Sequence, residues 1–369
     1  MDWPTIFTYA PFGVFALTFL VFVLRLGLRV RAQACWTIFL LLSAAKFLCF
    51  GAFGGHPFRP ELPELLIWTW DWMYSGAMIL CPLAVLLFFC RAPWKRWALP
   101  AVAWGLATWG LYNGFAPPAV HEMELVFDDL PPSLEGYRIV QISDLHASDA
   151  ARRWRTQAVV DLVNSLEPDL ICMTGDYADG RVARVGAFVE PLKELRAKDG
   201  VLASTGNHEY YSNYGEWTRE FYSKAKNIRF LNGACAFPRE GLAVGGVADS
   251  FWRPDVRHVF AAATNGEFRV LLQHRPEWGR LNADECDVRL QLSGHTHGGI
   301  APFARDYVAS YNNGFVRGLY PFGRAYLYVS PGSGQWGGFP MRFFNPSEVG
   351  LFTLRRSPER EKDGENPVW

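Results

Sequence analysis

The stretch VRLQLSGHTHGG, residues 288–299, leads from an alternating apolar segment into two histidines separated by one residue. The segment VRLQLS is typical of a β-strand, because apolar and polar residues alternate with a period of two. In extended backbone, side chains at i and i+2 point to the same side, so His295 and His297 should face one point while Thr296 points away. The flanking glycines permit a tight turn and a close approach of a ligand. Two imidazoles held in this way favour a metal site.

Four other apolar segments also end in residues that bind metals or transfer protons. These residues are Asp144 and His146 in IVQISDLH, Asp176 and Asp179 in DLICMTGDYAD, Asn207, His208 and Glu209 in GVLASTGNHE, and His274 in VLLQHRPE. Asp144 and His146 repeat the i, i+2 spacing, with Leu145 pointing away. Open α/β sheets bind ligands beyond the carboxyl ends of their strands, so these segment ends are expected to converge. The joint arrangement is specific, although any one of these groups alone would be weak evidence.

The segments that carry these groups belong to a longer alternation of short apolar and amphipathic stretches. Predicted strands are residues 123–128, 137–143, 169–175, 200–206, 268–273, 288–294, 325–330 and 349–354, and predicted helices are 153–166, 185–195 and 214–226. Strands that alternate with helices predict a layered α/β domain. We place this domain at residues 117–355, and the charged tail at 356–369 is expected to be disordered.

Residues 1–116 have a different composition from the rest of the chain. Four apolar runs, 6–24, 34–53, 65–89 and 97–115, reach or approach the roughly 20 residues that cross a bilayer. We therefore predict a transmembrane domain of four helices. The first run is not expected to be a cleaved signal peptide, because its positive charges follow the apolar stretch instead of preceding it.

Lysine and arginine in the connecting segments predict the orientation of these helices, because such residues concentrate on the cytoplasmic side. The first segment contains Arg25, Arg29 and Arg31, the third contains Arg91, Lys95 and Arg96, and the second contains only Arg59 beside two glutamates. The first and third segments should then be cytoplasmic, which places everything after residue 116 outside. In a Gram-negative bacterium the chain would be an integral inner-membrane protein with its second domain in the periplasm.

Two charged residues, Lys46 and Asp71, lie inside the apolar runs. Charges within a membrane are costly and usually have partners. Both residues are expected at a similar depth of roughly 10 Å, so that they could pair. A structural ion pair or a snorkelling lysine is the favoured interpretation, and a polar site for a lipid headgroup or a proton relay is the alternative.

The charge balance bears on the choice of partner. The 369 residues contain 36 Lys and Arg and 36 Asp and Glu, of which residues 1–116 hold 8 and 4. The first part is slightly positive and the rest slightly negative, which does not indicate a nucleic-acid partner.

The strand-end groups occur in the order of a known signature. DLH at 144–146, GDYAD at 175–179, GNHE at 206–209, His274 and GHTH at 294–297 resemble the five blocks of the calcineurin-like metallophosphoesterases. The resemblance covers roughly residues 120–355, and residues 328–354 look like the C-terminal part of the bacterial membrane-associated members. One departure is Ile300, where those members commonly continue with Gln.

This resemblance implies a four-layer α/β/β/α sandwich and a centre of two divalent metal ions. Asp144, His146, Asp176 and His297 would hold one ion, and Asp176, Asn207, His274 and His295 the other, with Asp176 bridging. Two such ions activate a bridging hydroxide for in-line attack on phosphorus. His208 would stabilise the transition state or protonate the leaving group, and Asp179 or Glu209 could orient a ligand histidine. Ligands without thiolate suit Mn, Fe or Zn, and manganese is expected to support activity.

Three functions remain open on these residues. The first is a membrane-anchored phosphoesterase, expected to be a phosphodiesterase, that acts on a lipid or envelope phosphate ester. Aromatic residues that could face the membrane in this case are Trp217, Trp252, Trp336 and Phe339. The second is a UDP-2,3-diacylglucosamine-type pyrophosphatase of lipid A synthesis, which needs a cytoplasmic domain and so conflicts with the loop charges. The third is a non-catalytic metal-binding sensory module, although no expected ligand is missing.

Overall fold

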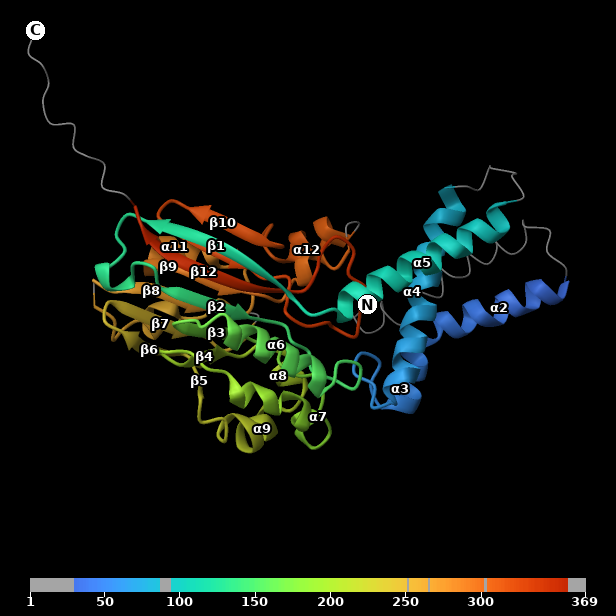
Figure 1. Ribbon diagram of the computed structural model, residues 1–369, viewed down its shortest axis with the longest axis horizontal. Coiled ribbons are helices and arrows are strands. Elements are labelled where there is room, and N and C mark those ends of the chain that lie inside the picture. The colour runs from blue at the N-terminus through green and yellow to red at the C-terminus, as the bar shows by residue number, and fades with distance from the viewer. Residues whose placement is uncertain (1–29, 87–93, 251, 265, 302–303, 358–369) are drawn as a thin grey trace, which may run out of the picture.

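A computed structural model describes residues 30–86, 94–250, 252–264, 266–301 and 304–357 of the chain. A helical part and a mixed α/β part follow each other along the sequence (Figure 1). The first expected apolar run, 6–24, and nearly all of the expected disordered tail lie outside the described residues.

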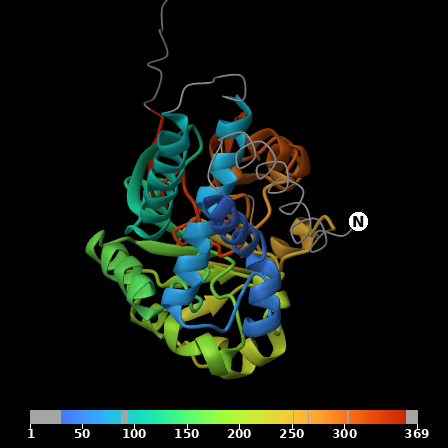
Figure 2. The same cartoon turned by 90° about the vertical axis from the view of Figure 1, so that its right-hand side faces the viewer.

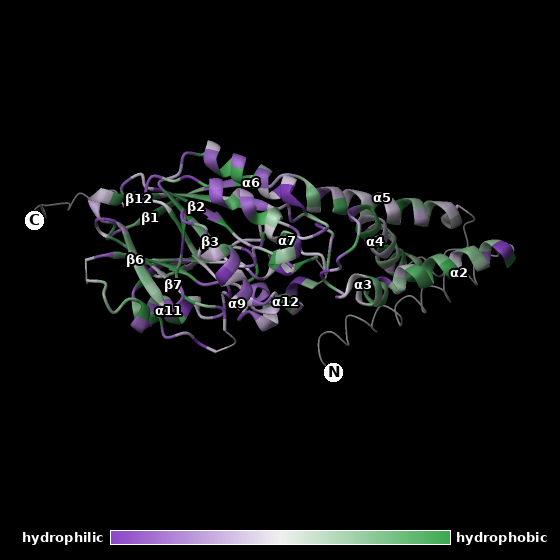
Figure 3. Ribbon diagram, turned by 90° about the horizontal axis from the view of Figure 1, so that it is seen from below, coloured by the Kyte–Doolittle hydropathy of each residue, from purple (hydrophilic) through white to green (hydrophobic). Residues whose placement is uncertain are grey.

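The helical part contains α2 (Val30–Ala44), α3 (Lys46–Gly54), α4 (Glu64–Leu86) and α5 (Lys95–Phe115). These helices occupy the second, third and fourth expected apolar runs, and in Figure 3 α2, α3 and α4 are mainly green, whereas much of α5 is pale. Among the described residues, no single helix combines the length and hydropathy of a membrane span, whereas α2 and α3, bent by 58° at their junction, meet these criteria as a pair.

Lys46 begins α3 at this bend and is paired with Asp71 of α4. Its Nζ lies 2.7 Å from Asp71 Oδ1, and both side chains are fully buried. The rings of Phe47, Phe50 and Tyr74 surround the ammonium group at 4.8–5.5 Å. The expected pairing is confirmed, and Lys46 also donates a hydrogen bond to the carbonyl of Gly337 at 3.2 Å, in the α/β part.

Two six-stranded sheets form the α/β part. The first has the order β1-β12-β2-β3-β4-β5 and the second β10-β11-β9-β8-β7-β6. The strands of the first sheet are β1 (Ala119–Phe127), β2 (Arg138–Ile142), β3 (Leu170–Thr174), β4 (Val201–Ser204), β5 (Ile228–Phe230) and β12 (Glu348–Arg356). Those of the second are β6 (Ala234–Arg239), β7 (Leu242–Gly246), β8 (Phe268–Leu272), β9 (Val288–Ser293), β10 (Gly318–Phe322) and β11 (Ala325–Val329). Strands β2 to β5 are parallel, as are β7, β8, β9 and β11, so their carboxyl ends share one edge of each sheet.

Three apolar clusters separate four layers. One cluster fills the space between the sheets and includes Ile139, Leu170, Val270 and Leu290. A second lies between the first sheet and the helices α6 (Arg153–Ser165) and α7 (Val182–Val189). A third lies between the second sheet and the helices α10 (Val256–Val259) and α11 (Gly279–Cys286). The α/β part is therefore the expected α/β/β/α sandwich, whereas four membrane-spanning helices are not established.

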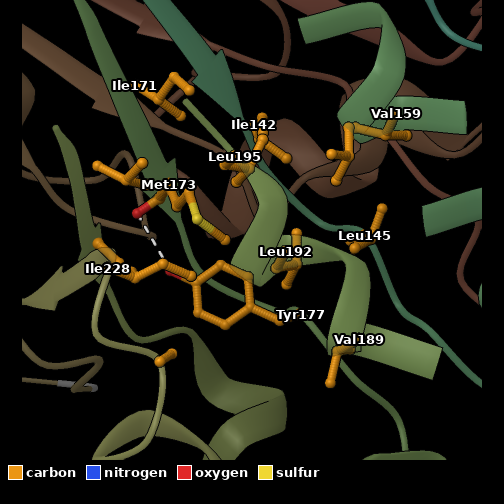
Figure 4. Close-up of a cluster of buried hydrophobic side chains, with 14 of the residues drawn as sticks. Ile142, Leu145, Val159, Ile171, Met173, Tyr177, Val189, Leu192, Leu195 and Ile228 are labelled. Carbon is orange, nitrogen blue, oxygen red and sulfur yellow. Dashed lines mark hydrogen bonds between the residues drawn. The ribbon is translucent and has the colours of Figure 1, made fainter. Parts of the chain in front are cut away.

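Tyr177 shows how this core positions a functional loop. Its buried ring packs beside Ile142, Met173 and Ile228 (Figure 4), and its hydroxyl donates to the carbonyl of Met173 at 3.1 Å. Because Tyr177 directly follows Asp176, the apolar cluster anchors the loop at the end of β3.

Two predicted helices differ from those observed. The stretch 185–195 forms the end of α7 and a 3₁₀ helix at Glu190–Glu194, and 214–226 forms two short helical turns, Tyr214–Trp217 and Thr218–Tyr222. Pro191 stands in the second position of the 3₁₀ helix, where it cannot donate the backbone hydrogen bond of a continuing α-helix. The remaining short helices are α8 (Asn207–Tyr211) and α12 (Arg305–Tyr311).

Candidate metal centre

All seven expected metal ligands lie just beyond the carboxyl end of a strand. Asp144 and His146 follow β2, Asp176 follows β3, Asn207 follows β4, His274 follows β8, and His295 and His297 follow β9. Both sheets thus contribute to one site at the edge of the sandwich that faces the helical part (Figure 1). Figure 2, which views the molecule from the helical end, shows the helices in front of this edge.

The backbone of these ligands is not extended, contrary to the expectation for both i, i+2 pairs. Asp144, His146, His295 and His297 have φ values of 51°, 48°, 72° and 47°, in the left-handed region that is costly for residues other than glycine. Hydrogen bonds between loops hold them there, such as that from His146 N to the carbonyl of Asp176 at 3.0 Å. The intervening residues do point away: Leu145 is buried in the core and Thr296 donates its hydroxyl proton to the Val316 carbonyl.

The first group of ligand atoms consists of Asp144, His146 and His297, whose ligand atoms all lie within 4.8 Å of one another. The Nε2 atoms of His146 and His297 are 3.2 Å apart. Asp144 Oδ1 lies 3.9 Å from His146 Nε2 and 3.6 Å from His297 Nε2. One carboxylate and two imidazoles therefore converge on one point.

The second group consists of Asp176, His274 and His295, with Asn207 beside them. His274 Nε2 lies 3.2 Å from both Asp176 Oδ2 and Asn207 Oδ1. Asp176 Oδ2 is also 3.8 Å from His146 Nε2, so it touches both groups, as expected of a bridging ligand. Burial disfavours its charge, but His274 and His208 outweigh burial and hold the pKa of Asp176 well below its usual value.

The donor set fits divalent metal ions, because lone pairs face each other across both groups. The Nδ1 atoms of His146 and His274 lie 3.0 Å from the Asp179 carboxylate and 2.7 Å from the Thr174 carbonyl. Since these oxygens only accept, each Nδ1 carries a proton, and the Nε2 atom of each ring is the one that faces inward and can bind a metal ion when it is unprotonated. A cation between the facing nitrogen and oxygen atoms removes their repulsion. A proton competes for the same position, and the carboxylates of Asp176 and Asp144, against burial, raise the pKa of His274 to about 10.

His208 lies beside the first group, and 16% of its side chain is exposed. Its ring meets that of His146 edge-on at 4.6 Å, and its Nδ1 lies 2.6 Å from Asp179 Oδ1. Burial favours the neutral ring, but the charges of Asp179 and Asp176 outweigh burial and raise the pKa of His208 to about 9. A protonated His208 with its Nδ1 occupied by Asp179 keeps Nε2–H free to donate.

Asp179 and Glu209 have different roles in this geometry. Asp179 Oδ1 accepts hydrogen bonds from both His146 and His208, so it fixes two ring orientations. Glu209 is buried and accepts from the backbone N–H groups of Asp176, Tyr177 and Gly206 at 2.6–2.9 Å. Glu209 therefore joins the two loops that follow β3 and β4, and the histidine-orienting role belongs to Asp179.

Two cationic neighbours of the site were not expected. Arg275 follows the ligand His274 directly, and its Nη1 lies 3.2 Å from His295 Nε2 while its Nε donates to Asp249 at 2.8 Å. The adjacency to His274 was the signal in the sequence that could have identified it. Arg59 comes from the segment between α3 and α4, and no local signal links it to the strand ends.

The four aromatic residues expected to face a membrane have different surroundings. Trp217 is only 1% exposed and donates its Nε1 proton to the Gly180 carbonyl, so it is a core residue. Trp336 stacks on His297 with ring centroids 5.9 Å apart, which places it at the candidate centre instead. Phe339 is half-buried beside that stack, and Trp252 is 82% exposed.

Comparison with known proteins agrees with this geometry. The sequence profile of the calcineurin-like phosphoesterases matches residues 137–299. A "Transmembrane protein with metallophosphoesterase domain" of Danio rerio is 32% identical over 267 residues, which cover 68% of this chain and 61% of that protein. The uncharacterized metallophosphoesterase YkuE of Bacillus subtilis is 30% identical over 61% of this chain and 82% of its own length. An uncharacterized metallophosphoesterase of Aquifex aeolicus is 30% identical over 64% and 91%.

These findings define the class of the α/β part as a sandwich of the calcineurin-like phosphoesterase type, with side chains that could hold metal ions. The chain belongs to the calcineurin-like metallophosphoesterase family. The match spans less than two thirds of the Danio rerio protein and 66% of a Helicobacter pylori relative, also an uncharacterized metallophosphoesterase.

Proposed function

We propose that the protein is a membrane-anchored, metal-dependent phosphodiesterase that cleaves a lipid or envelope phosphate ester. The observation that carries the proposal is the position of Asp176 between the two ligand groups. Its Oδ2 lies close to the Nε2 atoms of both His146 and His274. Two bound cations would supply positive charge to the phosphoryl oxygens and acidify a water molecule. The seven ligands would hold two such ions, with manganese, iron and zinc as the candidates.

His208 is the proposed proton donor to the leaving oxygen. Its Nδ1 is held by Asp179, so the other ring nitrogen, Nε2–H, is left to donate. When the bond between phosphorus and the leaving oxygen breaks, this proton moves to that oxygen and His208 becomes neutral. A positioned general acid of this kind contributes about 10²–10⁴-fold to the rate.

A substrate at the bilayer is supported by two features. The helices expose large apolar side chains such as Leu41, Phe53, Leu86 and Tyr112, which in water would be costly to leave uncovered. Two relatives, of Danio rerio and Bos taurus, are named as transmembrane proteins. Because the candidate centre lies at the edge of the sandwich that faces the helices, a phosphate ester at the membrane surface would be close to it.

Hydrolysis of bis-p-nitrophenyl phosphate and p-nitrophenyl phosphate by the detergent-purified protein with Mn²⁺ tests the proposal. We expect metal-dependent hydrolysis with a preference for the diester, and a loss of at least about 100-fold in Asp176→Asn and His208→Ala. Asp161→Asn, on an exposed turn of α6, should keep full activity. Failure of the folded, metal-loaded protein to hydrolyse either ester would favour a sensory role.

A further inference from the structure

The segment between α3 and α4, residues 55–63, returns from the helices to the candidate centre. Phe58 of this segment stacks on Trp336, with ring centroids 6.0 Å apart and an interplanar angle of 28°. Trp336 in turn stacks on the candidate ligand His297 at 5.9 Å and 22°. The ring of Trp336 therefore lies between Phe58 of the helical part and the candidate ligand His297 of the α/β part.

Contacts on both sides hold this loop in place. At its base, Glu61 N donates to the Gly54 carbonyl at 2.8 Å. At its rim, Glu61 pairs with Arg181 at 3.5 Å, and Glu64, just beyond it, lies 3.7 Å from Arg152. The Lys46 bond to Gly337 fixes the neighbouring turn that carries Trp336. A loop with so many anchors presents its side chains in a defined orientation.

Arg59 is the cation that this loop brings to the site. Its Nη1 donates to Ser212 Oγ at 2.9 Å, and Ser212 is a buried residue that directly follows α8, the helix bearing Asn207 and His208. The guanidinium is half-buried, and among the described residues no carboxylate lies within 4.0 Å of it. Within the described part of the chain, one of its five N–H donors has a partner, Ser212, which leaves most of the guanidinium for an external acceptor.

Nearby charges place Arg59 on the His208 side of the centre. Burial lowers the pKa of the Arg59 guanidinium, and the charge of Asp179 is the first to oppose this. His56 responds to the same surroundings: burial and Arg59 lower its pKa, while Asp179 raises it. Since Asp179 Oδ1 is bonded to His208 Nδ1, Arg59 lies near the pair that Asp179 and His208 form.

We infer that Arg59 is a substrate-binding residue, which holds a phosphate oxygen of the phosphoester while Ser212 anchors the other edge of its guanidinium. The inference rests on the proposed function and extends it, since the helical part then supplies a side chain to the active site. A planar guanidinium can bond two partners in fixed directions, which the point charge of lysine does not reproduce. The ligand chemistry is an anionic phosphoryl group, free or esterified.

Calorimetric binding of inorganic phosphate to the full-length, Mn²⁺-loaded protein in detergent tests this role. Arg59→Gln keeps a donor for Ser212 but removes the charge, and we expect a Kd for phosphate about tenfold weaker, as for one charge-assisted hydrogen bond. Arg59→Lys should recover only part of this loss. Lys224→Gln removes one positive charge from an exposed position away from the α3–α4 loop and should leave the Kd within twofold of the wild type.

Hydrolysis of bis-p-nitrophenyl phosphate by the same variants separates the inference from the proposed function. We expect Arg59→Gln to raise KM more than it lowers kcat, because the contact serves binding. An unchanged Kd in Arg59→Gln, an equal loss in Lys224→Gln, or no phosphate binding by the wild type would each overturn the role of Arg59. Phosphate binding that depends on Arg59, without ester hydrolysis by the wild type, would refute the hydrolase and leave Arg59 as an anion-binding residue.

Discussion

Asp179 is the residue that links the proposed proton donor, His208, to the candidate metal ligand His146. One oxygen, Oδ1, accepts from His146 at 3.0 Å and from His208 at 2.6 Å. A carboxylate behind a ligand histidine fixes the tautomer and increases the basicity of the ring. Asp179→Asn should therefore lower Mn²⁺ affinity by about 10–100-fold. Isothermal titration of metal-stripped protein would measure this change, and Asp161→Asn is the matched control.

An unchanged Mn²⁺ affinity in Asp179→Asn would mean that His146 does not need its carboxylate partner to bind metal.

The spacing of the candidate ligands in the sequence is enough to predict which residues converge, because each stands at the end of an apolar strand. Their left-handed backbone could not be predicted in the same way. It depends on hydrogen bonds between loops distant in sequence, such as that from Asp144 N to the Gly175 carbonyl.

Among the structural elements, the strands that carry ligands were the most predictable. All eight predicted strands are present, whereas β5, β6, β7 and β10 were not expected. These four strands lack a strong local signal: β5 has three residues, β6 and β10 contain proline, and β7 ends in two glycines. They form through pairing with neighbours, which a single stretch of sequence does not reveal. The α3–α4 loop escaped prediction for a related reason, since its partners lie about 120 to 280 residues away.

The pairing of α3 with α4 through Lys46 and Asp71 leads to a stability prediction. Lys46→Met would leave Asp71 buried beside no cation, which typically costs about 3–5 kcal/mol. The double variant Lys46→Met with Asp71→Leu should recover most of this loss, because both desolvated charges are then gone. Thermal unfolding in detergent measures both changes. Lys224→Met, which breaks an exposed pair with Glu220, should change stability by less than about 1 kcal/mol.

At the scale of the whole molecule, one end of the helical part contacts the α/β part. Trp68, near the start of α4, donates to the Ala150 carbonyl at 3.0 Å, and Asn113, near the end of α5, donates to the Arg342 carbonyl at 3.4 Å. The α3–α4 loop contacts the same face. If α4 and α5 cross a bilayer, this loop and the α/β part must therefore lie on the same side of it. This arrangement agrees with the orientation inferred from the loop charges.

That orientation can be tested by thiol labelling in intact bacterial spheroplasts. Both variants are made in a protein whose seven cysteines have been replaced. Lys224→Cys introduces a thiol at an exposed position of the α/β part, and Arg31→Cys introduces one at the end of the helices that lies away from the α/β part. A membrane-impermeant maleimide should label the first variant directly and the second only after permeabilisation, because arginine-rich segments stay cytoplasmic. The reverse pattern would place the centre in the cytoplasm, where a UDP-2,3-diacylglucosamine-type substrate becomes the stronger candidate.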